Sequence, residues 1–292
     1  MGTLSFQENK LLSALCTFGI GGPARYFAEI HSIPEMQQAI LVCLERQIPY
    51  FILGKGSNCL FDDRGFNGAV FLNKIDFLER PSTEVYHVGA GYSFSLLGTQ
   101  SARHGMSGLE FASGIPGSVG GAVFMNAGAN GRETCESLES VDFVDESGQF
   151  VTLKKNELHF AYRTSSFHHK KGAIVGATFV LTPLETARAK QIEIITYRKK
   201  TQPYGDMSAG CIFRNPNCGH AGALIDQSGL KGTQIGDAKV SEIHANFIVN
   251  VANASSKEVL ELISLVQAQV KLKTGADLQS EVRYISPEGV HE

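Results

Sequence analysis

The chain has 292 residues, of which 43% are hydrophobic and 19% are charged, and its formal net charge is −3. This length allows two or three domains, or one large domain, with an ample core. The slightly acidic balance argues against nucleic-acid binding as the main function, and no apolar run reaches the eighteen residues that a membrane span needs.

Cysteine usage and the N-terminal sequence bear on the compartment. The six cysteines include no C-x-x-C pair, and the N-terminus shows no basic stretch followed by an apolar core. We therefore expect a cytoplasmic protein with free thiols, without a disulfide framework, a metal site or a membrane partner. We expect a monomer or a weak oligomer.

Apolar runs and turn residues predict the elements of the first half. In chain order these are a strand over 24–30, a helix from Pro34 to about Gln47, a buried strand over 49–54, strands over 69–73 and 85–91, and a helix over 93–104 that ends at Gly105.

The second half begins with a hairpin around the polar turn 146–148. It continues with strands over 173–181, 211–215 and 244–251, a helix over 185–200, and a helix that starts at the Ser255–Glu258 capping box and ends at Gly275. Hairpins mixed with helices predict an α+β fold. The break at Thr182-Pro183 predicts a domain boundary.

The segment 113–129, SGIPGSVGGAVFMNAGA, combines five glycines with several apolar side chains. It is too apolar for a flexible linker and too rich in glycine for a buried strand. We expect its bare backbone to lie against a large, flat or charged ligand.

A second glycine-rich loop, Gly54-Lys55-Gly56-Ser57-Asn58, follows a predicted strand. Consecutive backbone N–H groups in such loops bind phosphate oxygens. Residues 54–58 and 114–121 could therefore hold a ligand with a central pyrophosphate, although 54–58 could equally be only a tight turn. The standard dinucleotide fold fits poorly, because Cys59 stands where its third glycine belongs.

Six motifs occur in one order along the chain: LGKGSN, GLEFASGIPGSVGGAVFMNAGA, YRTSSF, SAGCIFRNP, GLKGTQIGDAKVSEIHANFIVN and EVR. Their series resembles that of the UDP-N-acetylenolpyruvoylglucosamine reductase family, from Thr17 to about Ile285. The short stretch between 185 and 210 resembles the compact form of that family, which lacks a long substrate-covering loop.

The resemblance implies a vanillyl-alcohol-oxidase-type (PCMH-type) FAD-binding fold with a C-terminal α+β substrate domain. It implies FAD-binding subdomains at 1–75 and 76–184 and a substrate domain at 185–292, whose last residues return to the flavin. It further implies non-covalent FAD, NADPH as hydride donor, and a UDP-sugar substrate. The implied reaction reduces the enolpyruvyl ether of UDP-N-acetylglucosamine-enolpyruvate to UDP-N-acetylmuramate, for peptidoglycan synthesis.

The resemblance also implies site residues. Arg163 would bind the substrate carboxylate, Cys211 would protonate C2, and Glu281, with a raised pKa in the complex, would hydrogen-bond the enolate. Cys211 departs from the family, which commonly has serine there. The substrate-binding residues would be Tyr162, Arg163, Arg214, Asn215 and His244. The FAD-binding residues would be Gly54, Lys55, Gly56, Ser57, Asn58, Gly114, Ile115, Pro116, Gly117, Ser118, Gly120, Gly121, Asn126, Ala127 and Gly128.

Two other functions stay open at this point. One is a flavin oxidase of the same superfamily that acts on another small molecule, and the other is an inactive flavin-binding module. The oxidase is expected to need oxygen access and to lack the three catalytic residues. The inactive module is expected to lack one or more of them, whereas this chain has a chemically competent group at all three positions.

Overall fold

In the computed structural model, which describes residues 5–291, the chain divides into two compact units. Unit 1 comprises the described part of 1–6, Phe27–Lys55 and Ala69–Arg198, and unit 2 comprises Gln7–Tyr26, Gly56–Gly68 and the chain from Lys199. The division into 1–75, 76–184 and 185–292 stays a prediction, and its residues 1–4 and 292 lie outside the described residues. Within the described part, no helix is both long and apolar enough to cross a membrane.

Unit 1 is built on an antiparallel five-stranded sheet of order β12-β11-β15-β7-β6. The hairpin predicted around 146–148 is confirmed, because β11 and β12 pair directly. The strands are β6 (Leu78–Glu79), β7 (Val85–Gly89), β11 (Leu138–Asp145), β12 (Phe150–Lys154) and β15 (Gly172–Val180).

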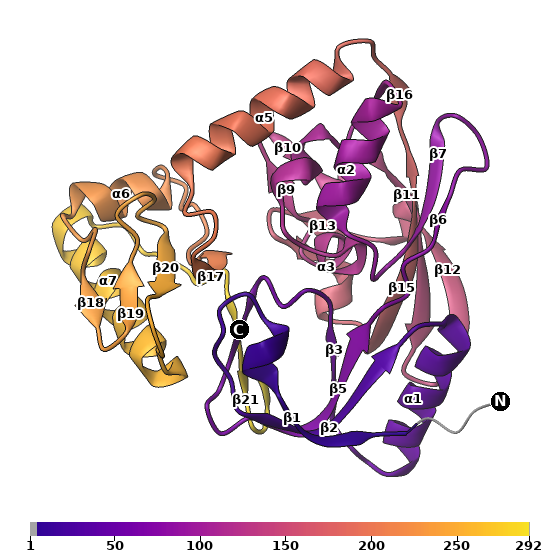
Figure 1. Ribbon diagram of the computed structural model, residues 1–292, viewed down its shortest axis with the longest axis horizontal. Helices are drawn as coiled ribbons and strands as arrows, with labels where there is room; N and C mark the ends of the chain where they lie inside the picture. Colours follow the sequence, from indigo (N-terminus) through magenta and orange to yellow (C-terminus); the bar gives the residue numbers. More distant parts are fainter. Residues whose placement is uncertain (1–4, 292) are drawn as a thin grey trace. The chain divides into compact units, whose positions relative to one another are not determined.

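Helices α2 (Phe94–Arg103) and α3 (Val119–Phe124) pack against this sheet (Figure 1). Their apolar side chains, such as Leu97 and Val123, share one buried cluster with Val88 and Ala177 of the strands. The predicted helix over 93–104 is confirmed, and its N-cap is Ser93. This cluster forms the core that carries the segment 113–129.

The other elements of unit 1 are shorter or lie at its margins. The predicted helix from Pro34 is α1, and the buried strand over 49–54 is β3, which pairs in parallel with β5. The elements are α1 (Ile33–Glu45), β3 (Tyr50–Leu53), β8 (Met106–Ser107), η2 (Glu110–Gly114), β9 (Gly128–Ala129), β10 (Arg132–Glu133), α4 (Thr134–Ser137), η3 (Lys155–Glu157), β13 (Phe160–Ala161), β14 (Thr164–Ser165), η4 (Ser166–His168) and β16 (Thr182–Pro183).

Three elements contain a boundary between the units. They are the predicted strands β2 (Pro23–Ile30) and β5 (Phe66–Asn73) and the predicted helix α5 (Ala187–Thr201), all three of which are confirmed.

Unit 2 has a four-stranded sheet of order β17-β20-β19-β18 that packs with α6 and α7 (Figure 1). The capping box at Ser255 and the left-handed Gly275 bound α7 as predicted, and its apolar stripe is buried in the core. The elements are β1 (Gln7–Leu11), η1 (Leu12–Leu15), β4 (Cys59–Phe61), β17 (Met207–Cys211), α6 (Ala221–Gln227), β18 (Gln234–Ile235), β19 (Ala238–Val240), β20 (Phe247–Asn250), α7 (Ser256–Thr274), β21 (Arg283–Ser286) and β22 (Gly289–His291).

A histidine network spans the other face of the unit 1 sheet. Tyr86 and Val88 are buried in the core, so the strand alternation turns His87 to the opposite face. Its Nε2 lies 2.8 Å from Asp142 Oδ2 and its Nδ1 lies 3.2 Å from Glu79 Oε2. Partial burial acts to lower the pKa of His87, but the hydrogen bonds with the two carboxylates outweigh it and raise the pKa above its usual value.

This raised pKa predicts a pH-dependent stability. The protonated His87 stabilises the fold below its unfolded pKa of ~6.5, and the contribution is lost as the pH rises through the higher folded value. The difference in unfolding free energy between wild type and His87→Gln is expected to be larger at pH 5.5 than at pH 8, by about 1 kcal/mol because the network is partly exposed. Urea unfolding at both pH values measures it, and an equal difference at both would contradict the prediction.

Candidate active site

Gly54, the first residue of the loop 54–58, lies against the segment 113–129 within unit 1. A Cβ on Gly54 would lie 2.3 Å from Ser118 Oγ, and one on Gly120 would lie 2.9 Å from Ala90 Cβ. Lys55 Nζ donates to Ser93 Oγ at 2.8 Å. These close approaches explain why the two positions are glycines, since a larger residue would press against Ser118 at position 54 and against Ala90 at position 120.

The loops differ in what their backbones offer a ligand. In the segment 113–129, the N–H groups of Val119, Gly120 and Gly121 already donate to groups inside unit 1. The N–H groups of Lys55-Gly56-Ser57 donate to no other described residue. The loop 54–58 is therefore the better candidate for an anion-binding nest, and the segment 113–129 supplies mainly bare backbone surface.

One buried polar atom beside this surface lacks a partner. Ser113 Oγ is buried and forms no hydrogen bond with any residue in the range 5–291. Such a group is costly unless a ligand or water satisfies it. An unsatisfied hydroxyl on a glycine-rich, partly apolar path fits the FAD that the resemblance implies, because that cofactor combines a flat ring system with many acceptor atoms.

The far end of the segment holds Arg163. Its Nη2 donates to Gly128 O at 2.9 Å, and its guanidinium lies 4.7 Å from the centre of the Tyr162 ring. These two residues form the turn between β13 and β14, where Arg163 has a left-handed φ of 56°. A non-glycine residue in that conformation is uncommon and often marks a functional site.

Asn126 supports this turn from within. Its side chain is fully buried, and its Nδ2 donates to Glu133 Oε2 at 2.8 Å and to Ala161 O at 3.0 Å. Its Oδ1 accepts from Cys135 N at 3.0 Å. Both amide hydrogens are thus used to hold the segment against the β13–β14 hairpin, so any contact of Asn126 with a cofactor would come from its backbone.

In unit 2, the chain around Cys211 corrects one prediction. The predicted strand over 211–215 is wrong, because the strand β17 ends at Cys211. An irregularity in the pairing with β20 falls between Ser208 and Cys211, where Gly210 has a φ of 76°. Such bulges reorient the next side chain and are frequent beside active sites.

Beyond Cys211, the side chain of Asn246 forms the hydrogen bonds that a neighbouring strand would otherwise form with the backbone of Phe213. Asn246 Oδ1 accepts from Phe213 N at 2.9 Å, and Asn246 Nδ2 donates to Phe213 O at 2.8 Å. Residues 212–214 also pair with the chain before β21, where Glu281 N donates to Ile212 O at 2.7 Å. This pairing brings the backbone of Glu281 beside the residue that follows Cys211.

Asn58 fixes Glu281 from the other side. Its Nδ2 donates to Glu281 O at 3.1 Å, and its carbonyl accepts from Arg283 N at 3.1 Å. The parallel pairing of β4 with β21 sets this register, because Cys59 lies opposite Arg283. The loop 56–58, Cys211 and Glu281 are therefore neighbours within unit 2.

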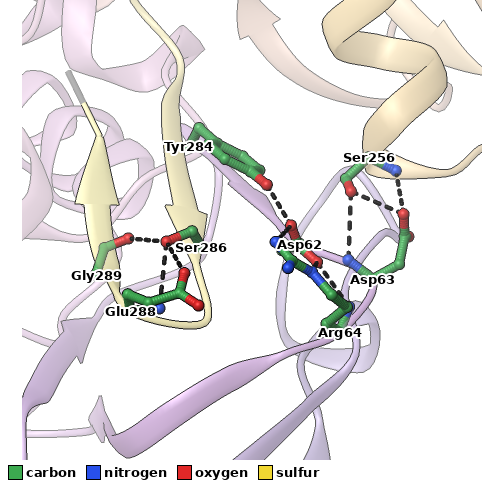
Figure 2. Close-up of polar contacts among 8 residues, drawn as sticks. All are labelled: Asp62, Asp63, Arg64, Ser256, Tyr284, Ser286, Glu288 and Gly289. Atoms are coloured by element: carbon green, nitrogen blue, oxygen red, sulfur yellow. Dashed lines mark hydrogen bonds and ion pairs between the residues drawn. The ribbon is translucent and has the colours of Figure 1, made fainter.

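A charged network anchors the same two strands (Figure 2). Arg64 donates to Asp62 through Nε and Nη2, each at 2.9 Å, and the Tyr284 hydroxyl of β21 also donates to Asp62. The Arg64 hydrogen bonds hold the pKa of Asp62 well below its usual range. Burial and the neighbouring carboxylate raise the pKa of Tyr284 to about 12. The network keeps β21, and with it Glu281, in place.

The side chains of the predicted substrate-binding residues in unit 2 differ in burial and in their hydrogen bonds. Arg214 Nε is buried and has no hydrogen-bond partner in the described part of the chain, so it could serve an anionic ligand. Asn215 Oδ1 accepts from Ala221 N at 3.0 Å, at the start of α6. His244 Nδ1 accepts from Asn246 N at 3.2 Å and its ring packs edge-on against Phe247, which supports a structural contribution.

The structure adds residues that the motif comparison does not single out. Ser113 lies inside a recognised motif, but only the absence of a hydrogen-bond partner draws attention to it. Arg198, whose side chain lies against Gly114, precedes the lysines 199 and 200 and carries no sequence signal of its own.

Two family descriptions match the chain. Residues 24–154 match the FAD binding domain family, and residues 202–285 match the family described as UDP-N-acetylenolpyruvoylglucosamine reductase, C-terminal domain. The first match confirms the predicted FAD-binding fold, and together the two ranges lie on either side of α5.

Individual proteins agree with the family descriptions. The chain is 65% identical over 280 residues to the UDP-N-acetylenolpyruvoylglucosamine reductase of Protochlamydia amoebophila, covering 96% of this chain and 94% of that protein. It is 50% identical over 281 residues to that of Chlamydia muridarum, covering 96% and 95%.

A solved structure extends the agreement to three dimensions. The crystal structure of UDP-N-acetylenolpyruvylglucosamine reductase from Thermus caldophilus superposes with a TM-score of 0.82 at 35% identity, over 97% of this chain and 99% of that one. Matches of this extent in sequence and structure show that the chain belongs to the UDP-N-acetylenolpyruvoylglucosamine reductase family.

Proposed function

We propose that the protein reduces the enolpyruvyl ether of UDP-N-acetylglucosamine-enolpyruvate to UDP-N-acetylmuramate, with FAD as cofactor and NADPH as hydride donor, in peptidoglycan precursor synthesis. The observation that carries this proposal is the 65% identity with a named reductase over 96% of the chain. The presence of Arg163, Cys211 and Glu281 in the matching motifs supports an active enzyme.

FAD, when bound, would supply the hydride transfer from NADPH to the substrate double bond, and the residues of this chain would hold it in place. We assign the diphosphate to the loop 54–58, whose N–H groups at 55–57 have no other described partner. We assign the ring system to the segment 113–129, with close approach at Gly114, Gly117 and Gly120. The contacts of Ile115, Pro116, Ser118, Gly121 and 126–128 with FAD belong to the same assignment.

Arg163 would bind the carboxylate of the enolpyruvyl group. A guanidinium stays cationic at all relevant pH values and can hold a carboxylate through two parallel hydrogen bonds. Its attachment to Gly128 O limits the positions that the guanidinium can take. Held in this way, Arg163 would stabilise the negative charge that develops on the carboxylate during reduction.

Cys211 and Glu281 would complete the reaction. Addition of hydride to C3 leaves an electron pair at C2, delocalised onto the carboxylate, and the Cys211 thiol would donate the proton that forms the new C2–H bond. Glu281, when protonated, would donate a hydrogen bond to the enolate. Tyr162, Arg214, Asn215 and His244 are assigned to the substrate on the resemblance alone.

We also propose a cytoplasmic location. All six cysteines are free, which fits a reducing compartment. The prediction of a monomer or weak oligomer is retained.

Anaerobic spectroscopy tests the proposed function. The purified protein is expected to show flavin absorbance that bleaches with NADPH and returns when the enolpyruvyl substrate is added. A flavin oxidase would regain its colour with oxygen but not with this substrate, and an inactive flavin-binding module would not bleach. A colourless protein with no affinity for FAD would refute the proposal.

The contact between Asn58 and Glu281 predicts a specific kinetic effect. Asn58→Ala removes the donor to Glu281 O and should slow substrate reduction by the FAD-saturated enzyme about tenfold, equivalent to about 1.4 kcal/mol. Bleaching by NADPH should change less. Stopped-flow measurement of the two half-reactions separates these steps.

A double-mutant cycle is the control for this prediction. If Asn58 acts through Glu281, adding Asn58→Ala to Glu281→Gln should cause little further loss. Independent, additive losses would show that Asn58 does not act through Glu281.

A further inference from the structure

Arg198 of α5 lies directly over Gly114 within unit 1. A Cβ on Gly114 would lie 2.3 Å from Arg198 Cδ and 2.5 Å from Arg198 Nε, so only glycine leaves room for this side chain. The Nε atom is buried and forms no hydrogen bond with the described residues. The Nε–H of this cation is thus packed against the first glycine of the segment 113–129 without an acceptor among the described residues.

Ser113, the residue before Gly114 in the chain, provides a second unsatisfied group. The residue is only 9% exposed, and its Oγ is buried without a partner among residues 5–291. A buried donor left unpaired costs about 1–3 kcal/mol, and here one belongs to the residue before Gly114 and the other to the side chain packed on Gly114. A hydroxyl and a guanidinium N–H together suit a ligand edge that carries acceptor atoms.

We propose that Arg198 and Ser113 bind the N1–C2=O edge of the flavin ring and that Arg198 raises the reduction potential of the bound FAD. The inference rests on the proposed placement of FAD along the segment 113–129. A fixed positive charge at that edge stabilises the negative charge that the ring system gains on accepting a hydride. Arginine suits this task because it never loses its proton.

The alternative acceptor in the same cofactor is the diphosphate. The three N–H groups at 55–57 offer a separate nest for it, and Lys55 adds a charge there. The segment that Arg198 contacts uses most of its own N–H groups internally and is lined by apolar residues, including Val119 and Val123 in the core. These two environments favour the flavin ring, rather than the diphosphate, as the ligand of Arg198.

Sulfite binding tests the proposal on the holoenzyme. Sulfite donates its electron pair to the flavin N5, forms an N5–S bond, and leaves negative charge on the N1–C2=O edge, so its affinity reports a cation there. Arg198→Met is expected to weaken sulfite binding at least tenfold. The two-electron potential should fall by about 30 mV for each tenfold loss of stabilisation of the reduced form.

Related variants keep the test decisive. Arg198→Lys should retain part of the effect, and Ser113→Ala should shift both measurements in the same direction by a smaller amount. Lys190→Met removes an exposed charge from the same helix, about 12 Å away along its axis, and should change neither. If Arg198→Met cannot be isolated with FAD, Arg198→Lys and Ser113→Ala decide the outcome.

The other outcomes separate this inference from the proposed function. Unchanged sulfite affinity and potential in a variant that still turns over substrate would overturn the inference alone. If Arg198→Met binds FAD more weakly and ADP competes less well with FAD for this variant, while the reduction potential of the bound FAD is unchanged, Arg198 would instead be assigned to the diphosphate. A wild-type protein that binds no FAD would overturn both proposals.

Discussion

Replacing Cys211 by alanine is expected to abolish turnover of the enolpyruvyl substrate while NADPH still bleaches the flavin. Removal of a general acid typically costs a factor of about 10²–10⁴, and alanine has no proton to donate. The bulge before Cys211 is backbone structure that alanine can adopt, so the loss should reflect chemistry. Anaerobic stopped-flow absorbance of the two half-reactions measures both effects.

Cys211→Ser is the matched control, because it keeps a protonated heteroatom at the same position. It should retain both half-reactions. A thiol has a reference pKa of about 8.5, far below that of an aliphatic hydroxyl, and only the protonated form can donate. Substrate reduction by wild type should therefore decline at a lower pH than substrate reduction by Cys211→Ser. Normal turnover by Cys211→Ala would remove Cys211 from the mechanism.

Most of the secondary structure could be predicted from local sequence patterns. The caps at Ser93, Ser255 and Gly275 and the hydrophobic stripe of α7 are encoded within a few residues, so pattern alone predicts them. The error at 211–215 has a long-range cause. The apolar residues Ile212 and Phe213 resemble a strand, but Asn246, more than thirty residues away, satisfies Phe213 in place of a neighbouring strand.

Less of the candidate site than of the secondary structure could be predicted from the sequence. The motif resemblance proposes Arg163, Cys211 and Glu281 as catalytic residues, but no local pattern shows that Asn58 supports Glu281 or that Asn126 braces the Arg163 turn. Those roles depend on contacts between residues far apart in sequence. Ser113 and Arg198 emerge only from buried atoms that lack partners, a property that exists only in the folded chain.

Arg163 gives the second large effect. Arg163→Met removes the cation assigned to the substrate carboxylate and should lower the rate of substrate reduction by about 10²–10³, the usual cost of losing one group that stabilises developing charge. Flavin bleaching by NADPH should persist. Arg163→Lys keeps the charge but cannot form two parallel hydrogen bonds with the carboxylate. Its rate of substrate reduction should therefore lie between those of Arg163→Met and wild type.

The surroundings of Arg163 set the controls for this experiment. The bond from Nη2 to Gly128 O and the left-handed φ mean that the arginine also orders its turn. Thermal unfolding of Arg163→Met should therefore accompany the kinetics, with Arg103→Met, an exposed arginine at the end of α2, as the matched loss of charge. If the role is electrostatic, substrate reduction will fall in Arg163→Met even at temperatures at which the variant is fully folded. Equal rates in Arg163→Met and Arg103→Met would show that the carboxylate is bound elsewhere.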